Sequence, residues 1–486
     1  MLNGNEQAML SDFEGLYDRI IPSNHMLRQF NDLVDFSFVY KELHDKYCLD
    51  NGRNAESPVR LFKYLILKAM YEMSDGDLVE RSKFDMSFKY FLGYRPEDDV
   101  ISTSLLSKFR KLRLADEDLM DKLLAKTVGI ALGLGIIKSK NIIVDSLHTV
   151  SRFHNRKAHE VLQEQAKKLR KATYRVDESI KGKFPAKVTN DNLDEHIAYC
   201  EELLDVVAAE DKMAIFESVT TAAGYLREML DDNLEHLRTS ADGGAKVGHK
   251  SADTSFFGYK THLAMTEEGI ITAASVTSGE KMDGKELTGL VEKSRAAGVE
   301  VDAVIGDGAY SEKENIEYAK GNFELVSRLS STVTKGYHRE GDGFEYNKDA
   351  GMYVCPAGHM AAAKTKRHNR DPRRKENPRS VYYFDIEKCK RCPMREGCYK
   401  EGSKSKTYSV SITSDIQKEH QKFQDTERFK EMASHRYKIE AKNGELKNRH
   451  GYSTAYSTGL QAMRIQGAAV LFVANLKRIV RLKGAI

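Results

Sequence analysis

The chain has 486 residues, of which 41% are hydrophobic and 30% are charged, and its formal net charge is +4. This length predicts two to four domains with a substantial buried core. Six cysteines in so long a chain exclude a disulfide framework. The first residues are polar and acidic, unlike a signal peptide, and the longest late apolar run, Gly467 to Ala474, is far below the ~18 residues of a membrane span. We therefore expect a cytoplasmic protein that does not enter a membrane.

Short helices are predicted throughout the N-terminal region, residues 1–130. Ser57-Pro58 starts one of them, with serine as the N-cap and proline at the first helical position. Asp75-Gly76 is expected to break this helix, and a second one to restart over Asp77 to Lys83. Ser102 or Thr103 caps a later helix that carries Lys108 and Arg110 among other cations. Short helices that end in a basic one are compatible with helix-turn-helix recognition of a duplex. A helical dimerisation domain fits the same pattern equally well.

The first candidate strand, residues 141–146, is a run of β-branched residues that ends at Asp145. Such a run predicts a buried strand, with the carboxylate at its end where a sheet presents its site. A long polar stretch rich in Glu, Lys, Ala and Leu follows, from about residue 154 to residue 240. It predicts two or three helices, with breaks at 184–185 and 189–192, which form an insertion that braces DNA or a partner subunit.

A hairpin and a second acid come next. Residues 257–265 and 270–276 predict two strands joined by a turn at 267–269. A helix is expected over 283–297, followed by a strand that ends at Asp307, whose neighbours Gly306 and Gly308 let the backbone turn and approach a ligand. Ser311 is the predicted N-cap of a helix to Lys320, and residues 323–329 predict a fifth strand. Taken alone, each aspartate is more often a turn residue than a ligand.

Positive charge is concentrated between Lys364 and Lys406, where 15 Lys and Arg face 6 Asp and Glu. This block carries a net +9, so the rest of the chain sums to −5. Such a concentration indicates a phosphate-binding surface, within which we select Arg373, Arg374 and Lys375 as contacts. A soluble disordered loop is the alternative.

Four cysteines accompany the basic block: Cys355, Cys389, Cys392 and Cys398. A Cys-x2-Cys pair with two further thiolates can close a tetrahedral structural zinc site, and His359 could replace one thiolate. Reduced cysteines without metal are the alternative. In both cases the role is structural, because four thiolates leave no position for a substrate.

A third acid lies on a late predicted helix, residues 435–447. At about 100° per residue, Arg436 and Glu440 lie roughly 40° apart and Glu440 and Lys447 about 20° apart. A carboxylate between two cations stays ionised, which suits a metal ligand beside a polyanion. Glu445 is the rival acid, but it lies about 140° from Glu440 around the helix. The alternative is a solvated helix face with ordinary ion pairs.

The order of these elements, β-β-β-α-β-α-β-α, resembles an α/β ribonuclease H-like core with a mixed five-stranded sheet and flanking helices. The chain resembles bacterial insertion-sequence transposases of the DDE class that have an all-α N-terminal domain and a cysteine-containing insertion. The motifs are Val144-Asp145-Ser146, residues 257–262 and 306–310, and Arg436-x3-Glu440-x6-Lys447. The resemblance divides the chain into 1–130, a core of 138–334 with the helical insertion 154–240, the basic insertion 335–407, and C-terminal core helices 408–486. Ala433 occupies the position of the tyrosine that begins the family's signature, which puts a hairpin intermediate in doubt.

The resemblance implies a Mg²⁺- or Mn²⁺-dependent transposase with Asp145, Asp307 and Glu440 as metal ligands. Water would free a 3′-hydroxyl at the element end, and that hydroxyl would attack target DNA, with Arg436 and Lys447 holding the flanking phosphates. The implied partners are double-stranded DNA of the element ends and the target, within a homodimer at the nucleoid. Two alternatives remain open: a metal-dependent nuclease that never joins DNA, and a DNA-binding regulator whose catalytic core has decayed.

Overall fold

The computed structural model describes residues 13, 15–47, 55–114, 118–152, 158–239, 242–249, 254–330, 333, 343–347, 350–367, 379–396, 398–411 and 414–484, without the side chains of 158, 231–239 and 411. The chain forms two compact units. Unit 1 comprises residues 1–301 and 437–486, and unit 2 comprises residues 302–436. The predicted basic insertion thus lies wholly in unit 2, and the N-terminal region and the helical insertion lie in unit 1.

Unit 1 begins with helices that join around a shared core. They are α1 (Leu16–Ile20), α2 (Met26–Leu33), α3 (Ser37–Leu43), α4 (Pro58–Tyr71), α5 (Asp75–Phe84), α6 (Met86–Leu92), α7 (Thr103–Arg113) and α8 (Leu119–Gly133). The predicted caps of α4 and α7, Ser57 and Ser102, hold the N-cap positions, and Pro58 is the first residue of α4. The predicted break between α4 and α5 exists, but it lies at residues 72–74, so α5 begins at Asp75 and not at Asp77. The side chain of Ser74 accepts a hydrogen bond from the amide of Asp77 and starts α5 at Asp75.

An antiparallel sheet forms the centre of unit 1. Strand β1 (Asn141–Val150) pairs with one edge of β3 (Ser255–Thr266), and β4 (Ile271–Ser278) pairs with the other edge. A further strand, β2 (Lys246–His249), pairs with the first residues of β3 and was not predicted. The prediction that the first strand ends at Asp145 is also wrong. Since β1 continues to Val150, Asp145 lies at its middle, opposite Leu263.

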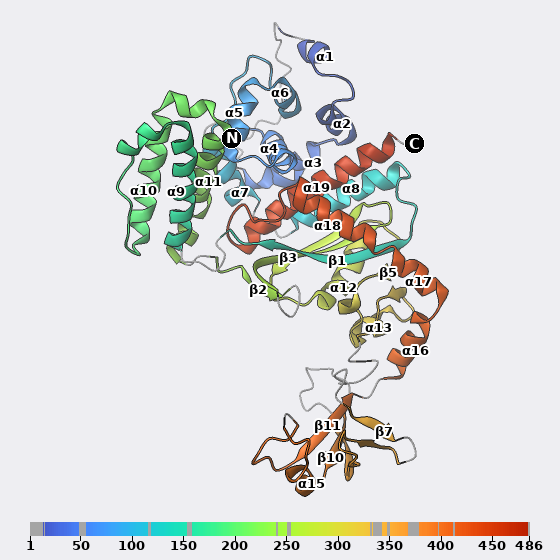
Figure 1. Ribbon diagram of the computed structural model, residues 1–486. Helices are drawn as coiled ribbons and strands as arrows, with labels where there is room; N and C mark the ends of the chain where they lie inside the picture. The colour runs from blue at the N-terminus through green and yellow to red at the C-terminus, as the bar shows by residue number, and fades with distance from the viewer. Residues whose placement is uncertain are drawn as a thin grey trace. The chain divides into compact units, whose positions relative to one another are not determined.

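Three helices cover this sheet: α8, α12 (Leu287–Ala296) and the long C-terminal α19 (Leu460–Lys483) (Figure 1). Asn475 of α19 is fully buried and joins α19 to β4, because its side chain bonds both the amide and the carbonyl of Ile271 at 2.8 Å. Its Nδ2 also donates to the hydroxyl of Thr127 on α8 at 2.9 Å. None of the described helices is long and apolar enough to cross a membrane.

The predicted helical insertion consists of α9 (Ala158–Val176), α10 (Leu193–Ala208) and α11 (Glu217–Thr239), which lie side by side in Figure 1. They surround a core of their own that includes Leu169, Cys200 and Leu203. Burial raises the pKa of Cys200 to about 12, as expected for a thiol that serves as a small apolar residue. Cys48 lies outside the described residues.

Unit 2 contains a parallel strand pair and a separate small sheet. Strands β5 (Ala303–Ile305) and β6 (Glu324–Val326) are parallel and are connected through α13 (Lys313–Ala319). The N-cap of α13 is Glu312, so the prediction of Ser311 was one residue early. Beyond β6 come β7 (Glu345–Asn347), β8 (Met352–Val354), β9 (Ala363–Arg367), β10 (Arg379–Phe384), α15 (Ile386–Lys390), β11 (Lys406–Ser411), α16 (Asp415–Gln424) and α17 (Glu427–Ser434).

The helix that carries Glu440 is α18 (Tyr437–Arg449), the first element of the returning part of unit 1. Arg436 lies before it, in the turn after α17, so the prediction that Arg436 and Glu440 share one helical stripe is wrong. The antiparallel sheet with its covering helices and the parallel β5–β6 pair are compatible with the predicted ribonuclease H-like core.

Candidate active site

Asp145 is the first of the predicted acids and is held by a rigid strand. The three residues before it, Ile142 to Val144, have no exposed surface. Its Oδ1 accepts a hydrogen bond from the amide of Ser146 at 2.9 Å, and its Oδ2 accepts one from Nδ2 of Asn443 at 2.9 Å. The carboxylate is therefore fixed from both sides, by its own strand and by α18.

Asn443 is a site residue that the sequence analysis missed. It lies on α18, three residues after Glu440 and four before Lys447, so all three share one side of the helix. Its Oδ1 is buried and has no hydrogen-bond partner among the described residues. A buried acceptor without a donor costs free energy, which indicates that this oxygen serves a ligand. Only the i+3 and i−4 spacing to the two predicted residues could have identified it.

Lys447, on the same side of α18 as Asn443, makes a second contact with β1. Its Nζ lies 3.3 Å from Nε2 of His148, three residues beyond Asp145 on the strand. Helix α18 thus contacts β1 twice, with Asn443 at Asp145 and with Lys447 at His148. A lysine ammonium at this contact between α18 and β1 suits an anionic substrate.

Glu440 and its rival Glu445 occupy different surroundings on α18. Glu440 is exposed in the first turn. Glu445 is half-buried, lies 2.8 Å from Nζ of Lys442 and packs beside His450. Burial opposes its ionisation, but the hydrogen bond with His450 and the charge of Lys442 outweigh that effect and hold the pKa of Glu445 at about 2. Glu445 is thereby engaged in structural ion pairs.

Asp307 follows β5 by two residues and belongs to unit 2. Its Oδ1 accepts a hydrogen bond from the amide of Ala309 at 2.9 Å, so the carboxylate caps the turn over Gly308–Tyr310. The hydroxyl of Ser327 donates to its backbone carbonyl. These two bonds fix the loop after β5.

The oxygens at Asp145 and Asn443 suit a hard divalent cation, because carboxylate and amide oxygens are the ligands that Mg²⁺ accepts. The orphaned Oδ1 of Asn443 beside the Asp145 carboxylate is the observation that supports this fit. Within the described residues, no three His, Cys, Asp or Glu side chains are gathered so as to hold a metal ion.

Two family descriptions match the chain. Residues 16–112, which span α1 to most of α7, match "Transposase domain (DUF772)". Residues 354–480 match "Transposase DDE domain". Together, the two matches support an insertion-sequence DDE transposase. The second match contains Glu440, Asn443 and Lys447, whereas Asp145 and Asp307 lie outside both matches. No curated protein matches the chain.

The four cysteines that accompany the basic block lie near one another in unit 2. Burial raises the pKa of the Cys389 thiol, and the neighbouring Cys398, Cys355 and Cys392 raise it further. The amide of Met394 donates to Sγ of Cys392 at 3.4 Å. Because the four thiols are close without forming a group that could hold a metal, the zinc site stays a prediction.

The predicted DNA-contacting cations of the transposase differ in their surroundings. Lys108 is exposed on α7. Arg110 is 13% exposed and makes two bonds with the buried carboxylate of Asp75, at 2.5 and 3.1 Å. Lys68 joins the same cluster, at 2.7 Å from Asp75 and 2.8 Å from Glu228 of α11. Arg110 therefore has a structural role, and Arg373, Arg374 and Lys375 lie outside the described residues.

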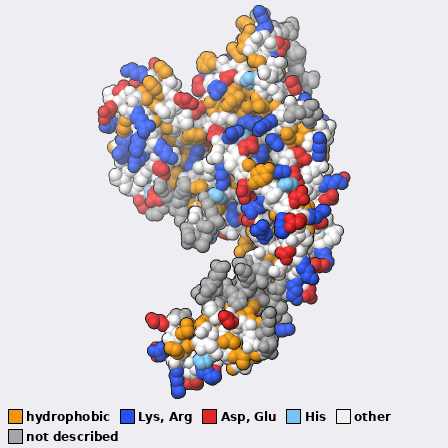
Figure 2. All heavy atoms as spheres, turned by 45° about the vertical axis from the view of Figure 1, so that its right-hand side comes forward, with side chains coloured by type: hydrophobic (Ala, Val, Ile, Leu, Met, Phe, Trp, Pro, Cys, Tyr) orange, Lys and Arg blue, Asp and Glu red, His pale blue; other side chains and the backbone are white. Residues whose placement is uncertain are grey.

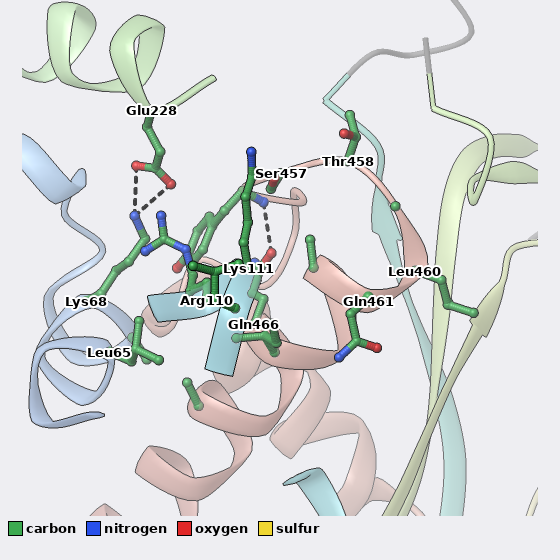
Figure 3. Close-up of a pocket in the computed structure, with 17 residues that line it drawn as sticks. Leu65, Lys68, Arg110, Lys111, Glu228, Ser457, Thr458, Leu460, Gln461 and Gln466 are labelled. Carbon is green, nitrogen blue, oxygen red and sulfur yellow. Dashed lines mark hydrogen bonds and ion pairs between the residues drawn. The ribbon is translucent and has the colours of Figure 1, made fainter. Parts of the chain in front are cut away.

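The transposase also has a largely apolar cavity of about 530 Å³ beside this ion cluster. Figure 3 shows Lys68, Arg110 and Glu228 on one side of it and the start of α19, with Leu460 and Gln461, on the other. Gln466 is bonded to the amide of Tyr456 and the carbonyl of Thr454. The cavity contains none of the predicted acids, so it is not the candidate active site.

Proposed function

We propose that this transposase cuts DNA at the ends of its element and joins the freed 3′-hydroxyl to target DNA by metal-dependent phosphoryl transfer. The observation that carries the proposal is the contact between Asp145 and Asn443, which brings β1 and α18 together at an acid and an unpaired oxygen. Matches to two transposase families support DNA as the substrate.

Asp145, Asp307 and Glu440 are the proposed metal ligands, as the family resemblance implies. When bound by these residues, divalent ions would activate the attacking oxygen and stabilise the leaving oxygen in an in-line displacement. Glu440 is preferred to Glu445 because Glu445 is paired with Lys442 and His450, whereas Glu440 is exposed on the helix side that carries Asn443.

The side chains of this chain orient the reaction. Asn443 holds the Asp145 carboxylate in one orientation through its Nδ2. Lys447 places positive charge beside His148 on β1, where it can bind a phosphate next to the scissile one. In the first step water attacks a phosphodiester of one strand. The cut strand then has a 3′-hydroxyl on one side of the break and a 5′-phosphate on the other. In the second step that hydroxyl attacks a target phosphodiester and displaces its 3′-oxygen.

The basic block from Lys364 to Lys406 is the proposed surface for general DNA affinity. In its described part, β9 presents the exposed cations Lys364, Lys366 and Arg367. The aromatic rings of Tyr382 and Tyr383 on β10 lie beneath Lys364 and Arg367. Cations held against rings on a sheet are pre-organised for phosphate contact.

The test is a strand-transfer assay with purified protein. A labelled duplex that carries the element end is incubated with a target plasmid in Mg²⁺ or in EDTA. The proposal expects Mg²⁺-dependent nicks at the end and a labelled, joined plasmid. Nicks without joined product would indicate a nuclease, and DNA binding without either would indicate a decayed regulator.

A further inference from the structure

A second hollow of unit 1, with a volume of about 720 Å³, lies where the catalytic strand meets the helical insertion. Its lining comes from four places: Arg152 after β1, Thr454 after α18, Gln165 and Lys168 of α9, and Ser218, Thr221 and Tyr225 of α11. Backbone hydrogen bonds between the end of β1 and the segment after α18 hold the floor of the hollow together. The amide of Val150 donates to the carbonyl of Ser453, and the amide of Ala455 donates to the carbonyl of Val150, both at 2.9 Å.

Arg152 is the distinctive residue of this hollow. Its guanidinium lies 5.1 Å from the centre of the Tyr225 ring, which holds it in place. Its Nη1 is buried and has no hydrogen-bond partner among the described residues. Arginine stays charged at every relevant pH, and a buried donor without an acceptor is costly. A guanidinium fixed in this way at the wall of an open hollow is suited to an oxyanion.

The other polar groups of the hollow favour the same ligand. The hydroxyls of Ser218, Thr221 and Thr454 and the ammonium of Lys168 are donors suited to phosphate oxygens. Two acids, Glu164 and Glu217, also line the hollow. Glu164 lies 3.7 Å from Lys168, and both side chains are largely exposed, at 39% and 58%. Such an exposed pair is weak and gives way to a polyanion at little cost.

Positive charge continues from the hollow along α9. Lys168, Lys171 and Arg175 are exposed and follow one another at i, i+3 and i+7, so they form a single stripe about 10 Å long. Lys and Arg side chains gather on this helical lobe at the left of Figure 2. The neighbouring α10 has five acids and no Lys or Arg between Leu193 and Ala208. The insertion thus presents a basic helix next to an acidic one.

The distance from the active site fits one DNA duplex. Arg152 is seven residues beyond Asp145 and two past the end of β1, and at ~3.3 Å per residue that separation is at most about 23 Å. At ~3.4 Å per base pair, a duplex that follows β1 would bring a phosphate about seven base pairs from the scissile bond to Arg152. A continuous polyanion is therefore the occupant that joins the hollow, the α9 stripe and the active site.

We propose that the Arg152 hollow and the Lys168–Lys171–Arg175 stripe bind the phosphate backbone of the element-end duplex, so that the helical insertion is a DNA clamp. This inference rests on the proposed function. It adds a DNA-binding surface outside the cleavage site, and this surface binds the phosphate backbone irrespective of base sequence.

The test measures binding by fluorescence anisotropy in EDTA, with a labelled 30-base-pair duplex of random sequence at several salt concentrations. We expect Arg152→Gln to weaken binding about tenfold, as for loss of a charged hydrogen bond. Its plot of log K against log salt should flatten by about 0.9. Lys171→Ala and Arg175→Ala should each flatten the slope. Glu217→Gln should tighten binding, because it removes a negative charge from the hollow.

Arg227→Ala is the matched control, since Arg227 is a half-exposed cation of the same insertion that faces Asp205 of α10. It should leave affinity and slope unchanged. Unchanged binding in Arg152→Gln, or an equal loss in Arg227→Ala, would overturn the proposal. If Arg152→Gln melts early, the exposed Lys171, Arg175 and Glu217 variants decide the matter. Inorganic phosphate titrated by calorimetry is a further arm, and tight binding of it with unchanged DNA affinity would assign the hollow to a free anion.

The wild-type strand-transfer assay separates this inference from the proposed function. Normal cutting and joining together with unaltered DNA affinity in the clamp variants would reject the clamp alone. Failure of the wild-type protein to cut would reject the proposed function.

Discussion

The amide of Asn443 donates a 2.9 Å hydrogen bond to the carboxylate of Asp145, and these two residues are 298 positions apart in the chain. The bond joins β1 to α18. It also leaves the other end of the same amide, Oδ1, buried and without a hydrogen-bond partner among the described residues.

The first prediction tests this bond. Asn443→Ala should lower the apparent Mg²⁺ affinity of cleavage by about 10–100-fold, the usual effect of losing a residue that orients a metal ligand. Cleavage rates over a Mg²⁺ titration, together with Mn²⁺ binding followed by electron paramagnetic resonance, provide the measurement. Asn448→Ala on the exposed side of α18 is the control and should behave as wild type. Equal Mn²⁺ affinity in the two variants would contradict the role of Asn443.

A second prediction concerns the acids. Asp145→Ala, Asp307→Ala and Glu440→Ala should each abolish cleavage while DNA binding survives, because oxygen ligands are needed for the chemistry but not for phosphate contact. Nicking assays and anisotropy on the same preparations provide the measurement. Glu445→Gln is the comparison. An active Glu440→Ala beside an inactive Glu445→Gln would reverse the assignment of the third acid.

Features of the fold and the site that depend on local sequence patterns could be predicted, whereas those that depend on long-range contacts could not. The strand that carries Asp145, the hairpin and an insertion of two or three helices could be predicted, because runs of β-branched residues and helical periodicity are local features. The extension of β1 to Val150 was not, since His148 and Thr149 are polar residues in a strand paired with β3. Helix α18 begins after Arg436 because a turn follows α17. No capping residue in the sequence predicted that turn. Arg110 resembled a DNA contact because its partner Asp75 is 35 residues away. Long-range partners of that kind leave no pattern in one sequence.

The third prediction is a pH dependence of stability. The pKa of Glu445 is about 2 in the folded chain, below its ordinary value of 4.5. A lowered pKa means that ionised Glu445 stabilises the fold above about pH 4.5 and that this stabilisation is lost as the pH falls towards 2. The melting temperature of Glu445→Gln should therefore lie below that of wild type at pH 7, and the gap should close between pH 4.5 and 2. Calorimetric scans across this range provide the test, and a constant gap would count against the ion pairs.

A fourth prediction separates two cations of α7. Arg110→Ala leaves the buried Asp75 with one partner instead of two and should cost about 3–5 kcal/mol of unfolding free energy. Lys108→Ala removes an exposed charge, so it should leave stability unchanged and reduce the salt dependence of DNA binding by about one ion. Chemical denaturation and salt-dependent anisotropy measure the two effects. Full stability in Arg110→Ala would return Arg110 to the candidate DNA contacts.

The fifth prediction concerns the cysteines. We expect one structural zinc ion per chain in the segment from Cys355 to Cys398, because four neighbouring thiols would bind it in their ionised form. Elemental analysis of protein purified without chelator measures the stoichiometry. Cys392→Ser should release the metal, whereas Cys200→Ser, in the core of the helical insertion, should not. A content near zero in folded wild-type protein would assign the four thiols to ordinary packing.

The buried ion cluster has a consequence for how the protein is made. Lys68 and Glu228 are 160 residues apart, and at a synthesis rate of about 5–20 residues per second the second partner follows the first by roughly 8–30 seconds. During that interval Lys68 and Arg110 face Asp75 alone, with an excess of positive charge in the forming core. The buried ion cluster of the N-terminal helices is therefore complete only once α11 has been synthesised. A fragment cut after residue 130 would keep the match to the N-terminal family and lack the carboxylate that completes its interior.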